Sequence, residues 1–389
     1  MRVNQALVDF LNIAIFDRQI DCPNGADTAA AIFSVAKKNS VANVVYAGIE
    51  KLKIALDKET TERYRNEKDI ALYTFAMQLQ QVCVLSDLFE KAQIPFILLK
   101  GSRMRELYPS PELRTCGDID ILAKAPDDQI ISLMQSIGFT FRKDGGTTLN
   151  FSYGAALEVE IHRYLFDERI QFHGYFDTIW DRVQLKDGWN YQYMMTEEDF
   201  YVMMIAHFAK HFSRYGCGIR NAIDISVFLK NAPKTFSLEA AEAILKQLDL
   251  LPFEQKLLQL IQAWDSNQWT QQDMMLTDYI IGCGTFGNQH TNTAHSIVNV
   301  NQKNAKEKKI LFHVFPSFGI MSGLYPVLKK VPILLPFCWI ARWFRLIFAD
   351  RKRIQSVLKL YSQLDQETLQ KTRDIMQLMQ IENINDKSV

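Results

Sequence analysis

The sequence predicts an α+β fold: an α/β core built on a mixed sheet, with mostly helical N- and C-terminal segments around it. Runs of strand length that are apolar, or that alternate between apolar and polar residues, gather between residues 96 and 164. Outside that stretch apolar residues recur at helical spacing, as they do from Ile70 to Phe89. The 389 residues, 48% of them hydrophobic and 23% charged, have the composition of a folded globular protein with two or three domains.

These patterns divide the chain into four expected segments. Residues 1–95 form a helical N-terminal segment that packs on the core, and residues 96–190 form the core itself. Residues 191–305 are again expected to be helical, and a capping-type sequence that starts at Thr196 begins a helix there. Residues 306–389 combine a basic and aromatic stretch with a C-terminal helix.

Each element of the core follows from a local signal. An apolar run of strand length begins at Phe96, and Gly138 ends a helix. The turn sequence Asp144-Gly145-Gly146 lies between two runs of strand length, which indicates a hairpin. The expected order is strand 96–99, strand 118–122, helix 127–137, and strands 139–141, 148–153 and 157–164.

Two carboxylates project from one face of the strand expected over residues 118–122. Asp118 and Asp120 alternate with isoleucines, so both acids point the same way while the isoleucines enter the core. Neighbouring carboxylates repel each other unless a cation lies between them, and Mg²⁺ accepts a few carboxylates together with water and phosphate oxygens. The preceding Gly101-Ser102 turn can approach such phosphates with its backbone N–H groups.

A third acid follows on the strand over 157–164. Glu158 and Glu160 share one face of that strand, so either can complete the set. His162 lies on the same face, where it either orients Glu160 through a hydrogen bond or takes part in the chemistry.

These motifs resemble the polymerase-beta-like nucleotidyltransferase superfamily. Its signature is an apolar residue, Gly, then Gly or Ser, followed by Asp-apolar-Asp and a carboxylate on a later strand. The chain is also similar, more narrowly, to uncharacterised bacterial nucleotidyltransferases found near polysaccharide-biosynthesis genes. The residues that carry this second resemblance are Leu99-Lys100-Gly101, Tyr108-Pro109, Arg114, Gly117-Asp118-Ile119-Asp120 and Glu160-Ile161-His162.

The resemblance implies an enzyme, a Mg²⁺-dependent nucleotidyltransferase on the superfamily's mixed sheet. Such an enzyme moves a nucleoside monophosphate from a nucleoside triphosphate, ATP among the candidates, to an acceptor hydroxyl and releases pyrophosphate. The implied acceptor is a small molecule, a sugar, a lipid-linked molecule or a protein, with polysaccharide biosynthesis as one setting.

The resemblance also assigns roles to residues. Asp118, Asp120 and Glu160 would hold two Mg²⁺ ions, for which Mn²⁺ can substitute, and Glu160 is preferred over Glu158 because it precedes Ile-His as in the family. The turn at Gly101-Ser102 would hold the phosphates. Lys100 and Arg114 are the nearest cations in sequence and would also bind the nucleotide.

A second polar group is expected between two later helices. His207 and His211 lie four residues apart, a spacing that can bind metal, but Phe208 stands where a metalloprotease would have Glu. Further polar residues on these helices are Lys210, Arg220 and Asp224. The resemblance implies that this group contacts the second substrate or a phosphate, and a structural hydrogen-bond network is the alternative.

Composition limits the partners and the compartment. The chain has 44 Lys and Arg and 44 Asp and Glu, so no overall field attracts nucleic acid, and a nucleic-acid acceptor is not expected. The six Cys form no Cys-x-x-Cys pair, which argues against a disulfide framework and for a reducing, cytoplasmic location. Two rival functions remain, an inactive scaffold of a polysaccharide assembly system and a toxin-like nucleotidyltransferase that modifies tRNA or protein.

Residues 310–353 are aromatic, basic and interrupted by prolines. This composition suits weak peripheral contact with the inner face of a membrane, although the apolar run over 331–341 is shorter than the ~20 residues of a spanning helix. The alternative is a helix that packs on the core with its arginines extended to solvent. Because the run lacks a clean amphipathic period, the sequence favours packing.

Overall fold

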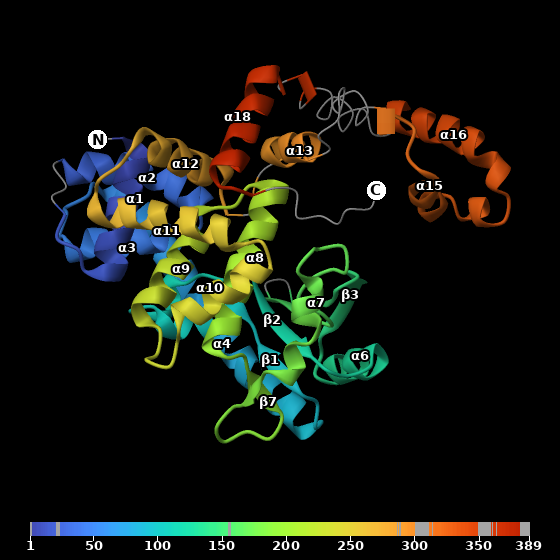
Figure 1. Ribbon diagram of the computed structural model, residues 1–389, viewed down its shortest axis with the longest axis horizontal. Coiled ribbons are helices and arrows are strands. Elements are labelled where there is room, and N and C mark those ends of the chain that lie inside the picture. The colour runs from blue at the N-terminus through green and yellow to red at the C-terminus, as the bar shows by residue number, and fades with distance from the viewer. Residues whose placement is uncertain are drawn as a thin grey trace.

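The computed structural model describes residues 2–20, 24–154, 157–285, 287, 289–299, 311–312, 314–348, 359, 361–362 and 364–381. One seven-stranded mixed sheet lies among helices, which confirms the predicted α+β class (Figure 1). The strand order is β3-β4-β5-β2-β1-β7-β6.

The strands are β1 (Phe96–Leu98), β2 (Asp118–Ala123), β3 (Thr140–Asp144), β4 (Thr148–Tyr153), β5 (Leu157–His162), β6 (Gln184–Leu185) and β7 (Gln192–Met194). The central strand β2 pairs with β1 in antiparallel and with β5 in parallel orientation. The predicted strands are all present. The two short strands at the other edge, β6 and β7, were not predicted, because two or three residues are too few to show an alternating pattern.

One face of the sheet is covered by a helix that precedes all the strands and by a helix that lies between β2 and β3. The long helix α4 (Lys58–Lys91) starts at Asp57, whose side chain accepts a hydrogen bond from the Thr60 N–H. Its last turns bury Leu85 and Phe89 against the strands, and α6 (Asp127–Ser136) packs on the same face.

The opposite face lies against a second helical layer. Its helices are α1 (Val3–Phe16), α2 (Gly25–Lys38), α3 (Ala42–Lys51), α8 (Glu197–Tyr215), α9 (Ile219–Asn231), α10 (Leu238–Gln247), α11 (Leu251–Ser266) and α12 (Gln271–Cys283). Helix α13 (Gln289–Val298) packs on α8, and its buried apolar residues belong to a separate apolar cluster. The core beneath this layer includes Ile97, Leu99 and Leu122 from the sheet. Parts of the first three expected segments therefore share one core, and their division into domains stays a prediction.

The C-terminal part contains α15 (Phe318–Leu324), α16 (Leu335–Phe348) and α18 (Gln366–Leu378). Helices α15 and α16 stand apart from the sheet and bury a small apolar cluster of their own (orange, Figure 1). This separate cluster argues against the favoured packing on the core. Residues 310, 313 and 349–353 of the expected interface segment lie outside the described residues. In the part of the chain that the structure describes, no helix has the length and apolar character to cross a membrane.

Candidate active site

A cavity of about 410 Å³ lies between the sheet and helices α8 and α9. This volume is in the range of small-ligand sites. Most of the predicted site residues line it, namely Lys100, Gly101, Arg114, Asp118, Asp120, Glu160, His207, His211 and Arg220. Two predicted residues, Ser102 and Asp224, are not part of this lining.

Strand register brings the acids together. In the parallel pair of β2 and β5, Asp118 is opposite Glu158 and Asp120 is opposite Glu160. The intervening Ile119 is 2% exposed and anchors the other face of the sheet. Because side chains alternate along a strand, all these acids point toward the helical layer that contains α8 and α9.

The two glutamates differ in their surroundings. Glu160 lines the cavity, and its Oε1 accepts a hydrogen bond from Nδ2 of Asn150 at 2.7 Å. Glu158 is exposed and is not part of the lining. The geometry therefore favours Glu160. Asn150 was not predicted, and it lies opposite Glu160 in the antiparallel pair of β4 and β5.

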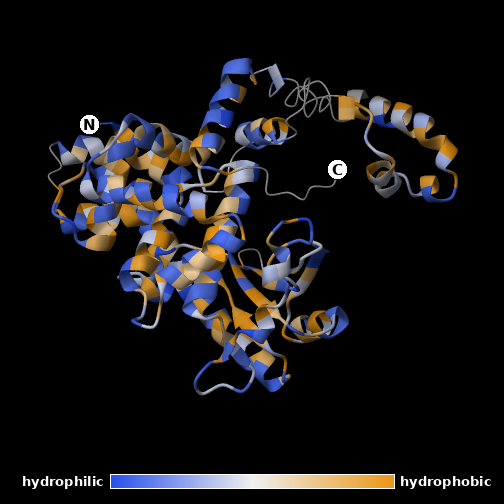
Figure 2. Ribbon diagram, in the orientation of Figure 1, coloured by the Kyte–Doolittle hydropathy of each residue, from blue (hydrophilic) through white to orange (hydrophobic). Residues whose placement is uncertain are grey.

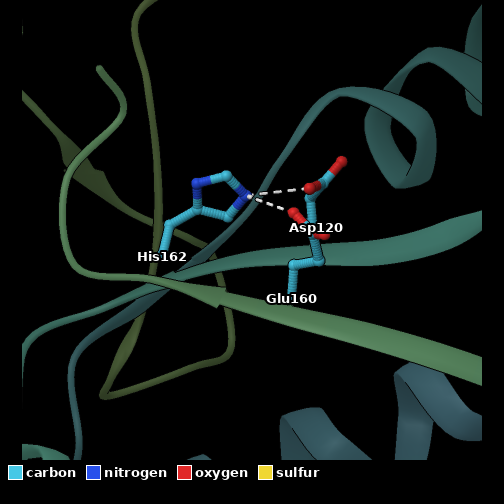
Figure 3. A group of neighbouring side chains, drawn as sticks. All are labelled: Asp120, Glu160 and His162. Atoms are coloured by element: carbon cyan, nitrogen blue, oxygen red, sulfur yellow. Dashed lines mark hydrogen bonds and ion pairs between the residues drawn. The ribbon is translucent and has the colours of Figure 1, made fainter. Parts of the chain in front are cut away.

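His162 contacts Asp120 rather than Glu160. Its Nε2 lies 2.8 Å from Oδ1 of Asp120 and 3.9 Å from Oε2 of Glu160 (Figure 3). Burial would raise the pKa of Asp120, but the charge of Lys100 and the hydrogen bond from His162 outweigh it and lower the pKa below its ordinary value. Asp120 is therefore a stable carboxylate.

Asp118 has the opposite tendency. Burial, followed by the negative charge of Asp120, raises the pKa of Asp118 to about 6. Two adjacent carboxylates that cannot both ionise freely are the arrangement that a bound cation would relieve.

The donor atoms fit a divalent cation. One oxygen each from Asp120 and Glu160 and one ring nitrogen of His162 all lie within 4.8 Å of one another (Figure 3). Carboxylate oxygens suit Mg²⁺ and Mn²⁺, and an imidazole nitrogen in the set suits Mn²⁺ better than Mg²⁺.

The turn after β1 differs in detail from the expected one. The positive φ falls on Lys100, at 24°, one residue before Gly101. A Cβ on Gly101 would collide with Sγ of Cys116, so glycine lets the 114–117 loop approach. The Ser102 N–H donates to the Leu99 carbonyl at 3.2 Å, and Ser102 lines a separate pocket beside α4.

Arg114 and Asp224 bind each other. Arg114 donates from Nε to Oδ1 and from Nη2 to Oδ2 of Asp224, both at 2.7 Å, and each side chain is 8% exposed. The Tyr108 hydroxyl donates to the same carboxylate at 2.7 Å. Burial would lower the pKa of Arg114, but the charge of Asp224 outweighs it and raises the pKa. This ion pair ties the loop before β2 to α9.

The helical wall of the cavity carries His207, Lys210 and His211 from α8 and Arg220 from α9. Nε2 of His207 and Nε2 of His211 are 2.9 Å apart. Burial, followed by the Lys210 charge, lowers the pKa of His211 to about 3, and burial with Lys100 also lowers that of His207. Both rings are therefore neutral, and they are not part of the three-residue metal group found among the described residues.

Lys210 is the functional candidate that sequence analysis gave least weight. It lies in the cavity lining, and burial, followed by the charge of Lys100, lowers its pKa to about 8. On the same wall, Arg220 donates from Nη1 to the Thr115 carbonyl at 3.0 Å. The signal in the sequence was the position of Lys210 between the two histidines on one helix.

Comparison with known proteins identifies the family to which the chain belongs. A family described as "Uncharacterised nucleotidyltransferase" matches residues 26–265, which is more than half of the chain, so the chain belongs to that family. No curated protein matches it. The resemblance inferred from the motifs is confirmed at the level of the family, and the family implies a nucleoside triphosphate substrate.

Two solved structures are similar at low levels. An antigenic nucleotidyltransferase-like protein from Paracoccidioides brasiliensis is 16% identical, over 43% of this chain and 86% of that one, with a TM-score of 0.27. The CCA-adding enzyme of Thermotoga maritima, complexed with tRNA, is 9% identical, over 80% of this chain and 85% of that one, with a TM-score of 0.23. Neither likeness is close enough to carry an argument about substrate.

Proposed function

We propose that this cavity binds a nucleoside triphosphate with Mg²⁺ and transfers its nucleoside monophosphate to the hydroxyl of an acceptor. The observation that supports this most directly is the pairing of charges across one cavity. Asp118, Asp120 and Glu160 lie on the strand side, and Lys100, Lys210 and Arg220 line the same cavity. Acids that can hold cations, beside cations that can bind phosphates, suit a triphosphate.

Asp118, Asp120 and Glu160 would hold the metal, as two Mg²⁺ ions for which Mn²⁺ substitutes. Bound metal supplies positive charge to the phosphates and lowers the pKa of a coordinated hydroxyl. His162 fixes the position of Asp120 through its 2.8 Å hydrogen bond.

The remaining residues position the reactants. Glu160, held by Asn150, accepts the proton of the acceptor hydroxyl directly or through water. The acceptor oxygen then forms a bond to the α-phosphorus while the bond to the bridging oxygen breaks, and pyrophosphate leaves. Lys100 and Lys210 stabilise the phosphate charge, and the Gly101 turn lies close to the same phosphates.

The acceptor is a small molecule, sugar, lipid-linked molecule or protein, and polysaccharide biosynthesis would provide such hydroxyls. The equal numbers of acidic and basic residues speak against nucleic acid. We place the enzyme in the cytoplasm, with peripheral membrane contact through residues 310–353.

The test is incubation with each α-labelled nucleoside triphosphate, Mg²⁺ and cell extract, with the Asp120→Asn protein as control. We expect the label to enter one class of acceptor only with the wild-type protein. Label in tRNA would favour the toxin-like alternative, whereas label in protein would agree with both functions. Mg²⁺-independent binding of nucleotide without transfer to any acceptor would favour the scaffold.

A further inference from the structure

The segment from Leu311 to Phe348 has a charge pattern unlike the rest of the chain. It contains no Asp or Glu, whereas the whole chain has equal numbers of acidic and basic residues. Its basic residues are Lys329, Lys330, Arg342 and Arg345. This region is therefore cationic even though the protein has no net charge.

The segment is folded around its own small core. Met321, Leu328 and Cys338 are buried together, between α15 and α16. The indole of Trp339 donates to the Pro316 carbonyl at 3.0 Å, and that of Trp343 donates to the Val314 carbonyl at 2.7 Å. The segment is thus a defined helical hairpin, which we call the α15–α16 hairpin.

A row of large apolar side chains faces solvent on this hairpin. Ile333 is 81% exposed, Phe337 67%, Ile340 45% and Phe344 58%. Ile333 lies just before α16, and the other three residues lie within it. Their spacings of four, three and four residues put these side chains on one face. Figure 2 shows many hydrophobic residues along α16. Scattered exposed apolar residues are ordinary, but a contiguous row marks an interaction surface.

The length of α16 determines how it could meet a bilayer. Its 14 residues span about 21 Å at ~1.5 Å per residue, less than the ~30 Å hydrocarbon core. A helix of this length with one apolar face lies in the plane of the interface, with that face about 5–10 Å into the headgroup boundary.

Charge decides between the possible occupants of this face. Lys329 and Lys330 are exposed just before the apolar row, and Arg345 is exposed at its other end. A second copy of the hairpin would bring the same cations against them, which is unfavourable. An anionic lipid surface offers both hydrocarbon for the aromatic row and negative charge for the cations.

We propose that the α15–α16 hairpin docks on anionic lipid bilayers, with Ile333, Phe337 and Ile340 inserted into the interface and Lys329 and Lys330 on the headgroups. This assigns a surface and a lipid class to the peripheral contact suggested above. It does not depend on the transfer reaction, so each can fail while the other holds.

The test is sedimentation of the full-length protein with vesicles of phosphatidylglycerol and phosphatidylcholine, or of phosphatidylcholine alone. We expect pelleting with the anionic vesicles at low ionic strength, reversal by salt, and none with neutral vesicles. The Phe337→Glu/Ile340→Glu protein should stay in the supernatant. The matched control is Ile70→Glu/Tyr73→Glu on α4, where the same change is made at sites 52% and 64% exposed, and it should pellet like the wild type.

A second pair of variants measures the charge contribution. Lys329→Gln/Lys330→Gln should weaken binding about 30-fold at low salt, since each basic residue near the surface contributes ~1 kcal/mol. Lys234→Gln/Lys246→Gln, at exposed sites elsewhere, should change it little. Circular dichroism and nucleotide binding check that every variant is folded.

Three results would overturn the proposal. The wild-type protein could remain in the supernatant, or it could pellet equally with neutral vesicles. The hairpin could instead hold a second copy, which would show as a dimer in light scattering that Phe337→Glu/Ile340→Glu separates while the α4 control does not.

Discussion

The strand wall and the helix wall of the cavity are built in different ways. On the strand wall, the acids stand two residues apart on β2 and β5, and the sheet register alone brings Asp120 beside Glu160. On the helix wall, His207 and Lys210 come from α8 and Arg220 comes from α9, so their meeting depends on how two helices pack. The face on which each acid lies therefore follows from alternation within one strand, whereas the pairing of β2 with β5 and the packing of α8 on α9 are both products of tertiary structure.

The two walls are also electrostatically complementary. Burial raises the pKa of Asp118 and the charge of Arg220 partly opposes this, while burial lowers the pKa of Lys210 and the charge of Asp120 partly opposes that. Each wall thus reduces the cost of burying charge on the other. The neutral histidines add hydrogen-bonding capacity to the helix wall without further positive charge.

The largest effect is expected for substitution of the acids of the strand wall, which should change activity far more than stability. Asp118→Asn and Asp120→Asn should each reduce nucleotidyl transfer on the order of a thousandfold or more, because the cation site is lost. Without metal, Asp118→Asn should melt at or above the wild-type temperature, since the raised pKa of Asp118 shows that its charge is disfavoured.

Asp120→Asn is the internal comparison for this prediction. It loses the charge that Lys100 and His162 stabilise, so it should melt at or below the wild-type temperature. A clear fall in the melting temperature of Asp118→Asn would mean that Asp118 is structural.

The next prediction concerns the third acid. Glu160→Gln should lose activity roughly several-hundredfold, since Glu160 lines the cavity and is held by Asn150. Glu158→Gln, the same change two residues away on an exposed side chain, should keep most activity. Transfer rates of the two purified proteins measure the difference, and the reverse ranking would move the third ligand to Glu158.

A third prediction tests the ion pair that joins the walls. Asp224→Asn leaves the Arg114 guanidinium buried without its counter-charge, and should lower the free energy of unfolding by about 3 kcal/mol. The control is Asp127→Asn, which removes an exposed partner of Arg163 and should cost less than about 1 kcal/mol. Urea unfolding of both proteins gives the two values. Equal losses would mean that burial adds nothing to the pair.

Sequence could predict which face of each strand the acids of the strand wall occupy, because alternation along a strand is local information. Alternation fixes the shared face of Asp118 and Asp120, and β2 and β5 have the bounds expected within two residues. The family was recognisable from the same motifs. Even so, the hydrogen bond from Asn150 was missed, because it requires the register of β4 against β5.

The helix wall and the loop before β2, which carries Arg114, could be predicted only in part. The residue types were found, but a pattern cannot show which cation pairs with which acid. The ion pair of Arg114 with Asp224 was therefore not predicted, although a structural hydrogen-bond network was the alternative for the group that contains Asp224. Ser102 follows Gly101 directly, but both residues belong to the short helix α5 (Lys100–Met104). The helical rotation from one residue to the next turns Ser102 away from the cavity and toward another pocket. The exposed row on α16 was missed because prolines obscured its period.

A smaller effect is expected in the pH dependence of the helix wall. The pKa of His211 is lowered to about 3, so the folded protein keeps this ring neutral while the unfolded chain takes up a proton near pH 6.5. The stabilisation is complete above pH 6.5 and is lost progressively as the pH falls below it. Between pH 6.5 and 5 the wild type should lose up to about 2 kcal/mol more than His211→Gln, measured by urea unfolding. Parallel curves for the two proteins would contradict a buried neutral ring.

The smallest expected effect addresses what the helix wall binds. If His207 and His211 contact the second substrate, alanine at either position should raise the KM for the acceptor or lower turnover, by roughly tenfold, because one or two hydrogen bonds are lost. Nucleotide affinity measured by calorimetry should stay unchanged, since Lys100 and the strand wall remain intact. Lys210→Ala is the comparison, because it removes a buried charge from the same wall and should weaken nucleotide binding as well. If nucleotide affinity falls in step with activity in the histidine variants, these rings belong to the phosphate site. If the purified protein contains stoichiometric zinc and the histidine variants lose it, His207 and His211 are metal ligands. The helix wall would then bind a metal rather than the second substrate.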